Sequence, residues 1–296
     1  MDKKIVFYLM NEKGFYTLKK FIKKFSSDSI EYIVSSKDTN IKKDYFKEIK
    51  QLCIKYKISF FDRNSNYLKK EKLFNGYEFA IGWKWIILNY KNLIIFHDSI
   101  LPKYRGFAPL VNTLVSNENL GGVTALFASN EYDKGDIIMQ KSMNINYPIK
   151  INSAIEQIKP LYYDLVEDIY TLILEDKQLP RQKQDENKAT YSMWLDGEDY
   201  FIDWQNWSAK KIKRFVDATS YPYDNAKAYL NGKVVKFIDV KVLEDVKVKN
   251  RKRHIGKVIF IQDSPVIVCK KGLLKLVDIQ DENDDNLMIN FRSRFE

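Results

Sequence analysis

A histidine and a downstream aspartate are the residues of this chain best suited to chemistry. His97 is one of only two histidines and ends an apolar stretch, whereas Asp133 precedes the glycine turn Lys134-Gly135. An imidazole titrates near neutral pH, and a carboxylate beside it orients the ring and stabilises its charged form. The pair predicts acid–base catalysis of an acyl transfer to an amine. A packed, structural histidine is the alternative.

The loop after His97 is polar and cationic, which suits a substrate that carries phosphate. It reads Ser99-Ile-Leu-Pro-Lys-Tyr104-Arg105-Gly. A lysine offers a point charge and an arginine a planar fork of donors. We therefore expect Lys103 and Arg105, together with Ser99 and Tyr104, to bind the substrate. In the alternative, Lys103 is solvated and Arg105 holds the loop to a carboxylate.

Length and composition indicate a folded protein with one large and one small domain. The chain has 296 residues, 45% of them hydrophobic and 14% aromatic, which excludes global disorder. The net charge of +10 favours phosphate-bearing partners without choosing among them. Cys53 and Cys269 lie far apart with no metal-ligand spacing, so we expect buried free thiols, no metal site and a reducing cytoplasm. No apolar run is long enough to predict a membrane span.

Strands alternate with helices in the first half of the chain. Strands are predicted over 3–9, 30–35, 58–61, 79–82, 93–97 and 122–128, and helices over 18–25, 42–56 and 151–174. This alternation predicts an α/β fold with a Rossmann-like, mainly parallel sheet and helices on both of its faces. Ligands bind beyond the carboxyl ends of such strands, which is where His97 would lie.

The second half predicts a small β-barrel. Residues 177–190 are polar and contain a proline, which is typical of a linker. A helix over 212–218 is followed by strands predicted over 227–229, 234–242, 256–261, 266–270 and 273–279. We expect a catalytic domain over 1–180, a linker and approach segment over 181–205, and an OB-like small barrel domain over 206–296. The polar tail 281–296 is expected to be partly loose.

These motifs together resemble the formyltransferase family that uses 10-formyltetrahydrofolate. The resemblance covers most of the chain, and its motifs are His97-Asp-Ser-Ile-Leu-Pro-Lys-Tyr-Arg-Gly-Phe-Ala-Pro109, Gly122-Val-Thr124, Asp133-Lys-Gly-Asp136, Ile202-Asp-Trp204, Tyr221-Pro-Tyr223 and Asn231-Gly-Lys233. It implies an N-formyltransferase in which His97 accepts a proton from the attacking amine and Asp133 orients the imidazole. The last three motifs are similar to the C-terminal domain of the tRNA and sugar enzymes of this family.

The resemblance also implies where the folate binds. Its pterin would lie between the segment around Asp133, with Asp136, and the loop after strand 79–82, which reads Trp83-Lys84-Trp85-Ile86. Two tryptophans suit the walls of an aromatic slot. Packing at the sheet edge is the alternative for each ring.

One position departs from the family pattern. The family has an asparagine two residues before the histidine, where its amide holds the formyl oxygen, and this chain has Ile95. Isoleucine donates no hydrogen bond, and losing one such donor typically slows a reaction by about a hundredfold to a thousandfold. Protonated His97, a backbone amide of the next loop, Ser99 or a water is the candidate replacement. A folate-binding homologue with impaired chemistry is the alternative.

The resemblance leaves two substrates to choose between, and we favour the amine of a nucleotide-linked amino sugar in the synthesis of surface polysaccharide or lipopolysaccharide. Methionyl-tRNA formyltransferases carry a basic insertion early in the fold, and the corresponding region 26–40 is short with mixed charge. Gly106-Phe-Ala108 also departs from the Gly-Ala-Ala typical of the tRNA enzymes. A nucleic-acid partner is therefore less expected. A homodimer is a separate expectation, for which the long helix over 151–174 or the small barrel offers a surface.

Overall fold

The computed structural model describes residues 3–64, 74–87, 91–261 and 264–296. Its contacts divide the chain into two compact units. The first comprises Met1–Thr113, Asn119–Ile145 and Ser153–Trp194, and the second Leu114–Glu118, Asn146–Asn152 and Leu195–Glu296.

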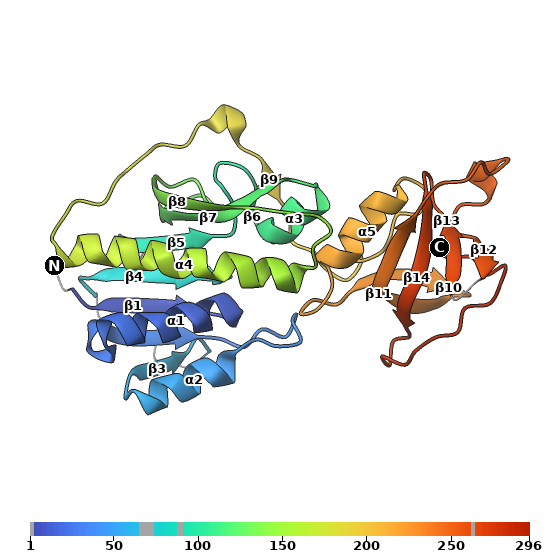
Figure 1. Cartoon of the computed structure of the whole chain (residues 1–296). Coiled ribbons are helices and arrows are strands. Elements are labelled where there is room, and N and C mark those ends of the chain that lie inside the picture. The colour runs from blue at the N-terminus through green and yellow to red at the C-terminus, as the bar shows by residue number, and fades with distance from the viewer. Residues whose placement is uncertain (1–2, 65–73, 88–90, 262–263) are drawn as a thin grey trace. The chain divides into compact units, whose positions relative to one another are not determined.

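A seven-stranded sheet forms the centre of the first unit (Figure 1). Its strands are β1 (Ile5–Leu9), β2 (Ile30–Ser35), β3 (Ser59–Asp62), β4 (Tyr77–Ile81), β5 (Leu93–His97), β7 (Leu120–Phe127) and β8 (Ile137–Asn144), in the order β3-β2-β1-β4-β5-β7-β8. Strands β1 to β5 pair in parallel, and β7 and β8 add to one edge in antiparallel fashion. The predicted mainly parallel sheet is confirmed. Strand β8 was not predicted, because its sequence, Ile137-Ile-Met-Gln-Lys-Ser-Met-Asn144, shows no regular alternation of apolar and polar residues.

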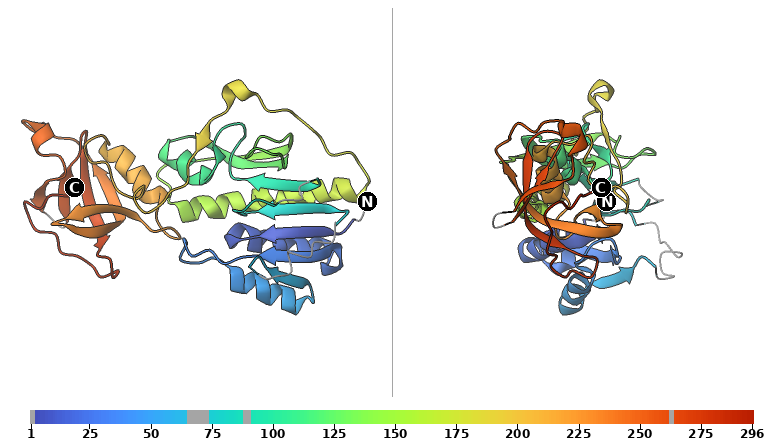
Figure 2. Two further views of the ribbon diagram at one scale, coloured as in Figure 1. Left: turned by 180° about the vertical axis from the view of Figure 1, so that it is seen from behind. Right: turned by 90° about the vertical axis from the view of Figure 1, so that its right-hand side faces the viewer.

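The helices α1 (Asn11–Phe25), α2 (Phe46–Lys55) and α4 (Ile151–Leu174) lie on one face of this sheet (Figures 1 and 2). Leu18, Phe21 and Ile22 form the buried stripe of α1, and the ring of Phe21 lies 5.1 Å from that of Phe7 in β1. Such a stripe, with apolar residues three and four apart, is what an amphipathic helix presents to a core.

The opposite face of the sheet carries a second apolar cluster. Val6, Tyr8 and Leu93 belong to it, and Trp83 and Ile95 pack against it. Successive strand residues point to opposite faces, so His97, two residues beyond Ile95, lies on this second face. The chain connections from β3 to β4 and from β4 to β5 include residues 65–73 and 88–90, which lie outside the described part of the chain.

Short elements surround the loop that follows β5. They are β6 (Arg105–Gly106), α3 (Pro109–Val115), η3 (Glu186–Lys188) and β9 (Tyr191–Ser192), and β6 pairs with β9 in parallel. Residues 182–192, here called the strap, therefore run beside the loop that follows β5. The segment 177–190, expected to be a linker, makes these contacts within the first unit.

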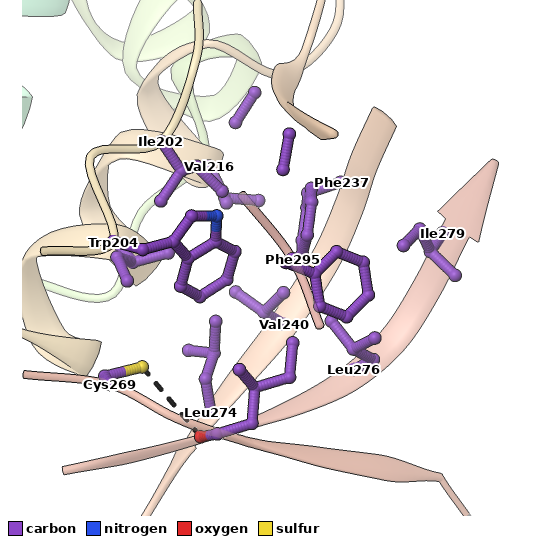
Figure 3. Packing of buried hydrophobic residues seen from close by; sticks show 14 of the residues in the cluster. Ile202, Trp204, Val216, Phe237, Val240, Cys269, Leu274, Leu276, Ile279 and Phe295 are labelled. Atoms are coloured by element: carbon purple, nitrogen blue, oxygen red, sulfur yellow. Dashed lines mark hydrogen bonds between the residues drawn. The ribbon is translucent and has the colours of Figure 1, made fainter. Parts of the chain in front are cut away.

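The second unit contains the expected antiparallel C-terminal sheet. Its elements are α5 (Ala209–Ala218), β10 (Ala226–Leu230), β11 (Lys233–Leu243), η4 (Arg251–Arg253), β12 (Val258–Ile261), β13 (Pro265–Val268) and β14 (Leu273–Gln280), with strand order β10-β11-β14-β13-β12. The sheet is a half-barrel, in agreement with the predicted small barrel. Figure 3 shows its core, in which Trp204, Phe237 and Phe295 are in ring contact.

The end of the tail, which we expected to be partly loose, makes specific contacts with the sheet. Phe295 is buried in the core, and it forms a β-bridge with Leu230 beside one edge of the sheet. Arg294 forms another bridge with Lys257 at the other edge. The burial of one aromatic ring explains why a mostly polar tail is held in place.

Two further expectations concern the whole chain. Cys53 and Cys269 are buried free thiols, which confirms the prediction. Among the described helices, none combines the length and the apolar character that a membrane span requires.

Candidate active site

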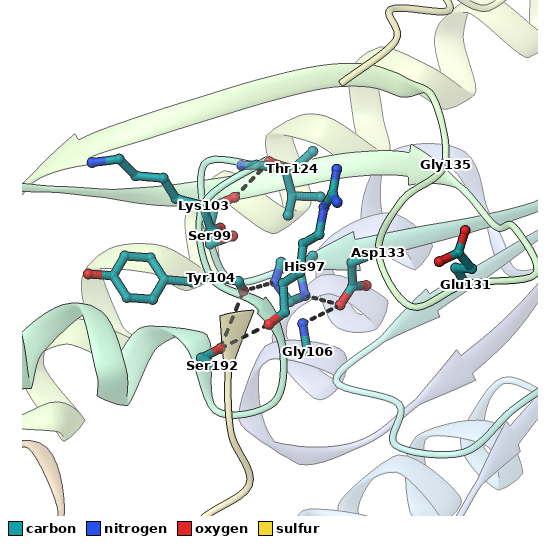
Figure 4. A network of polar contacts seen from close by, with 12 residues as sticks. His97, Ser99, Lys103, Tyr104, Gly106, Thr124, Glu131, Asp133, Gly135 and Ser192 are labelled. Atoms are coloured by element: carbon teal, nitrogen blue, oxygen red, sulfur yellow. Dashed lines mark hydrogen bonds and ion pairs between the residues drawn. The ribbon is translucent and has the colours of Figure 1, made fainter. Parts of the chain in front are cut away.

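His97 and Asp133 lie close together, although the turn that carries Asp133 starts at the opposite end of β5 from His97. The turn that carries Asp133 leaves β7 beside Leu93, whose carbonyl accepts a hydrogen bond from Ala128, and Leu93 begins the strand that His97 ends. The strand rise between these two residues is about 13 Å. The turn folds back so that Asp133 Oδ2 lies 3.6 Å from His97 Nδ1 (Figure 4). Both side chains are largely buried.

Each ring nitrogen of His97 faces an acceptor. Its Nε2 lies 2.7 Å from the carbonyl oxygen of Tyr104, and because a carbonyl only accepts, Nε2 carries a hydrogen. Nδ1 faces the carboxylate of Asp133, which also accepts a hydrogen bond of 2.8 Å from the amide of Gly106. Acceptors at both nitrogens suit the doubly protonated imidazolium, which is the form that proton transfer creates.

The hydroxyl groups of Ser99 and Thr124 form hydrogen bonds that stabilise the loop after β5. Ser99 Oγ donates to the carbonyl of Lys103 at 2.7 Å, and Thr124 Oγ1 donates to the carbonyl of Ser99 at 2.6 Å. The amide of Leu101 donates to Thr124 Oγ1 at 3.1 Å. The hydroxyl of Ser99, which we expected to contact substrate, is therefore used within the chain.

Arg105 is fully buried, and its guanidinium binds groups of the strap. It donates to both carboxylate oxygens of Glu186 at 2.7 and 2.9 Å, and to the amide oxygen of Gln184. The hydrogen bonds to Glu186 raise the pKa of Arg105, and the same contact lowers the pKa of Glu186. This geometry is that of the alternative in which Arg105 holds the loop to a carboxylate. In Figure 4 the side chains of Lys103 and Tyr104 extend away from His97 and Asp133.

The loop after β4 places Trp83 on the same sheet face as His97. The ring of Trp83 lies 5.2 Å from those of Tyr8 and Trp85, and its buried Nε1 has no hydrogen-bond partner among the described residues. Lys84 pairs with Asp38.

The other residues expected near the folate lie at the surface. Ile86 is 69% exposed. Asp136 forms a partly exposed ion pair with Arg181 at 3.4 Å. Within the described part of the chain, neither forms a hydrogen bond or an ion pair with His97 or Asp133, so their folate roles stay predictions.

Ile95 lies where the family pattern has asparagine and contributes no polar atom. It pairs in register with Ala80 and Leu126 and packs against apolar clusters. Several loop amides that were candidate replacements already donate to chain oxygens, namely those of Ser99, Leu101, Lys103, Tyr104, Arg105, Gly106 and Phe107. The Nε2 hydrogen of His97 is likewise used by the carbonyl of Tyr104. Of the groups we considered, His97 protonated at Nδ1 and a water are left as candidates.

Sequence reasoning missed three features of this region. An aromatic cluster joins Phe107 to Tyr132 and Trp194, with ring distances of 5.8 and 5.4 Å. A buried ion pair links Lys13 to Asp98, which follows His97 in the chain. The third is Gln184, whose contacts are described below. All depend on pairs distant in sequence, so no local pattern indicated them.

The fold is that of an α/β protein with a mainly parallel sheet and a small C-terminal β domain, and it brings His97 and Asp133 together at one site. A family model described as formyl transferase matches residues 75–159, and one described as formyl transferase C-terminal domain matches residues 195–291. A methionyl-tRNA formyltransferase of Thermodesulfovibrio yellowstonii is 31% identical over 228 residues, which are 74% of this chain and 70% of that protein. The chain belongs to the formyltransferase family.

Other relatives share less sequence or only the fold. A methionyl-tRNA formyltransferase of Halothermothrix orenii is 29% identical, and the aligned part is 68% of this chain and 63% of that protein. The solved N-formyltransferase of Helicobacter canadensis, in complex with folinic acid and dTDP-3-aminofucose, has a TM-score of 0.65 at 17% identity, covering 93% of this chain and 99% of that one. The methionyl-tRNA formyltransferase of Clostridium thermocellum has a TM-score of 0.57 at 19% identity, covering 83% and 94%.

Proposed function

We propose that this formyltransferase transfers the formyl group of 10-formyltetrahydrofolate to the amine of a nucleotide-linked amino sugar, for the synthesis of surface polysaccharide. The observation that carries the chemistry is the approach of Asp133 to His97 at 3.6 Å on one face of the sheet. It supports a base that takes a proton from an attacking amine.

The roles of the two residues follow from their contacts. Folate, when bound, supplies the formyl group. His97 accepts the proton that the amine loses as its nitrogen bonds to the formyl carbon, and returns it to the folate nitrogen whose bond to that carbon breaks. Asp133 stabilises the positive charge on the ring while it holds the proton. Because Nε2 is hydrogen-bonded to the carbonyl of Tyr104, the proton is carried at Nδ1, and this N–H also serves as a donor to the formyl oxygen in place of the family asparagine.

The loop after β4 fits a flat, polar ligand. The buried indole N–H of Trp83 lacks a partner among the described residues, and a pterin edge offers acceptors for such a donor. Trp83 and Trp85 would hold the folate from this loop, with Lys84, Ile86 and Asp136 at the rim. Lys103 and Tyr104 are left for the second substrate.

Two observations favour a sugar over a tRNA substrate. Between α1 and α2 the described chain has only η1 (Ser27–Ser29), β2 and the loop 36–45, which leaves no room for a large basic insertion. The second observation is Gly106-Phe-Ala108 in the loop after β5, which departs from the Gly-Ala-Ala typical of the tRNA enzymes. The free cysteines favour a reducing compartment such as the cytoplasm. A homodimer stays a prediction.

Initiator-tRNA formylation is the second candidate, because the sequence relatives are named methionyl-tRNA formyltransferases and the net charge is +10. In the experiment, each reaction contains the protein, 10-formyltetrahydrofolate and one class of acceptor. The acceptors are UDP-linked amino sugars, dTDP-linked amino sugars and charged initiator tRNA. We expect one sugar to gain the mass of a formyl group, and the His97→Ala protein to show no gain. Formylation of tRNA alone would overturn the choice of substrate. Folate binding without transfer to any acceptor would support an impaired homologue.

A further inference from the structure

Gln184, in the strap, bonds both loops that position the catalytic pair. Its Nε2 donates to the carbonyl oxygens of Asp133 at 2.7 Å and Gly135 at 2.9 Å. These are backbone atoms of the turn that brings Asp133 to His97. One amide group therefore holds the turn at two points.

The other end of the same amide binds the loop after β5. Gln184 Oε1 accepts from Arg105 Nε at 3.1 Å and from a terminal guanidinium nitrogen at 2.8 Å. Arg105 lies between Tyr104, whose carbonyl accepts from His97, and Gly106, whose amide donates to Asp133. The orientation of the amide is set by its partners, because an arginine only donates and a carbonyl only accepts.

We propose that Gln184 is a positioning residue, which sets the distance between Asp133 and His97 by joining the two loops that carry their partners. Only the expected loss of turnover in Gln184 variants rests on the formyl transfer proposed above. Its structural content, the approach of a carboxylate to His97 Nδ1, is independent of the substrate.

The chemistry of glutamine suits this position. Both amide hydrogens and both lone pairs of the oxygen are used, so the amide is fully satisfied. A glutamate of the same size would lose both donors and place a carboxylate against two carbonyl oxygens. A leucine would leave Arg105 and the turn without these partners, and unpaired buried groups are costly.

The strap is held to the loop mainly by polar contacts. The amide of Arg105 donates to the carbonyl oxygen of Thr190 at 2.9 Å, and the amide of Phe107 donates to the carbonyl oxygen of Ser192 at 3.0 Å. Gln182 exchanges two backbone hydrogen bonds with Ile137. Because Gln182 anchors the same strap through its backbone, its side chain provides a matched control.

The test uses the ring nitrogens of His97 as a probe that needs no substrate. The chain has two histidines, so ¹⁵N-histidine labelling yields signals from His97 and, as an internal reference, from His254 of the second unit. Within the described residues, Asp133 faces His97 Nδ1, Asp98 follows His97 in the chain and pairs with Lys13, and Arg105 in the next loop pairs with Glu186. Asp133 is the group expected to move most relative to His97 Nδ1 in Gln184 variants, because Arg105 keeps both of its hydrogen bonds to Glu186.

The measurement compares Asp133→Asn, Gln184→Leu, the double variant and the control Gln182→Leu in the full chain. We expect Gln184→Leu to reproduce most of the change in the His97 Nδ1 resonance that Asp133→Asn causes. The double variant should resemble Asp133→Asn alone, because Gln184 acts through Asp133. Gln182→Leu should leave the His97 signals as in the unmodified protein.

A His97 spectrum unchanged by Gln184→Leu, or additive effects in the double variant, would overturn the proposal. If Gln184→Leu fails to fold, Gln184→Glu provides the same comparison with the side-chain length retained. With 5-formyltetrahydrofolate as the binding probe, affinity should stay within about threefold, whereas turnover on any acceptor found above should fall on the order of tenfold or more. If no acceptor in that panel is formylated, this result would count against the proposed function but would not affect the NMR result.

Discussion

The imidazole of His97 is held between a backbone carbonyl and a carboxylate, which suits a residue that carries a proton for part of a reaction cycle. We predict that His97→Ala or Asp133→Ala reduces kcat by about 10²–10⁴, the usual contribution of a positioned acid–base group. The Kd of 5-formyltetrahydrofolate should change little, because neither side chain is expected to bind the pterin. Steady-state kinetics and calorimetry measure the two quantities. Near-normal turnover in either variant would exclude the role.

Ile95 allows the missing family donor to be restored. We predict that Ile95→Asn raises kcat, on the order of tenfold or more, because the new amide would lie on the same strand face as His97. The change also inserts a polar group where Ile95 packs against apolar side chains, at a cost of about 1–3 kcal/mol in the free energy of unfolding. Turnover and urea unfolding are measured on the same preparation. A slower enzyme with intact folate binding would show that another donor already occupies this position.

At the scale of an element, the turn between β7 and β8 needs glycine for close approach. A Cβ on Gly135 would lie 1.7 Å from the carbonyl oxygen of Phe127, so the turn must move to accept alanine. We predict that Gly135→Ala displaces Asp133, lowers turnover by about a hundredfold and destabilises the chain by about 1–3 kcal/mol.

The matched control for this change is Gly197→Ala, where no atom of the described residues other than its chain neighbours lies within 4 Å of the added carbon. It should leave both turnover and the unfolding midpoint unchanged. Equal behaviour of the two variants would show that the turn tolerates the displacement and that Asp133 does not depend on its shape.

The two cysteines report on the two units of the whole molecule. Cys53 belongs to the first unit and Cys269 to the second, and burial raises the pKa of each thiol to about 12. At pH 8 only about one thiol in 10⁴ is then ionised, and the thiolate is the reactive form. We predict that neither cysteine reacts with a thiol reagent in the native protein at pH 8, whereas both react in denaturant.

Mass spectrometry of the labelled peptides follows each unit separately. Because the thiols are protected by different cores, the urea dependence of each labelling reaction reports the opening of its own unit. The Cys269→Ser protein should keep the labelling curve of Cys53. Rapid labelling of Cys53 in native buffer would contradict its burial in α2.

Much of the fold was predictable, because it depends on local pattern. The buried runs of β1 and β5 and the apolar stripe of α1 are visible as periodicity. Strand β8 and the short pair β6–β9 escaped prediction. Strand β8 is stabilised by pairing with β7, and β6 by pairing with the distant β9, more than by their own composition.

The sequence by itself determined the family, the candidate pair His97 and Asp133, and the departure at Ile95, because these are statements about residue types at given spacings. Only the tertiary structure decided which groups face the ring of His97, and that Arg105 and Ser99 are used inside the chain. It also brought Gln184 to the turn of Asp133 from 51 residues away. Contacts of this kind depend on how the turn and the strap fold back on the sheet, and local sequence carries no signal for a hydrogen bond between residues so distant.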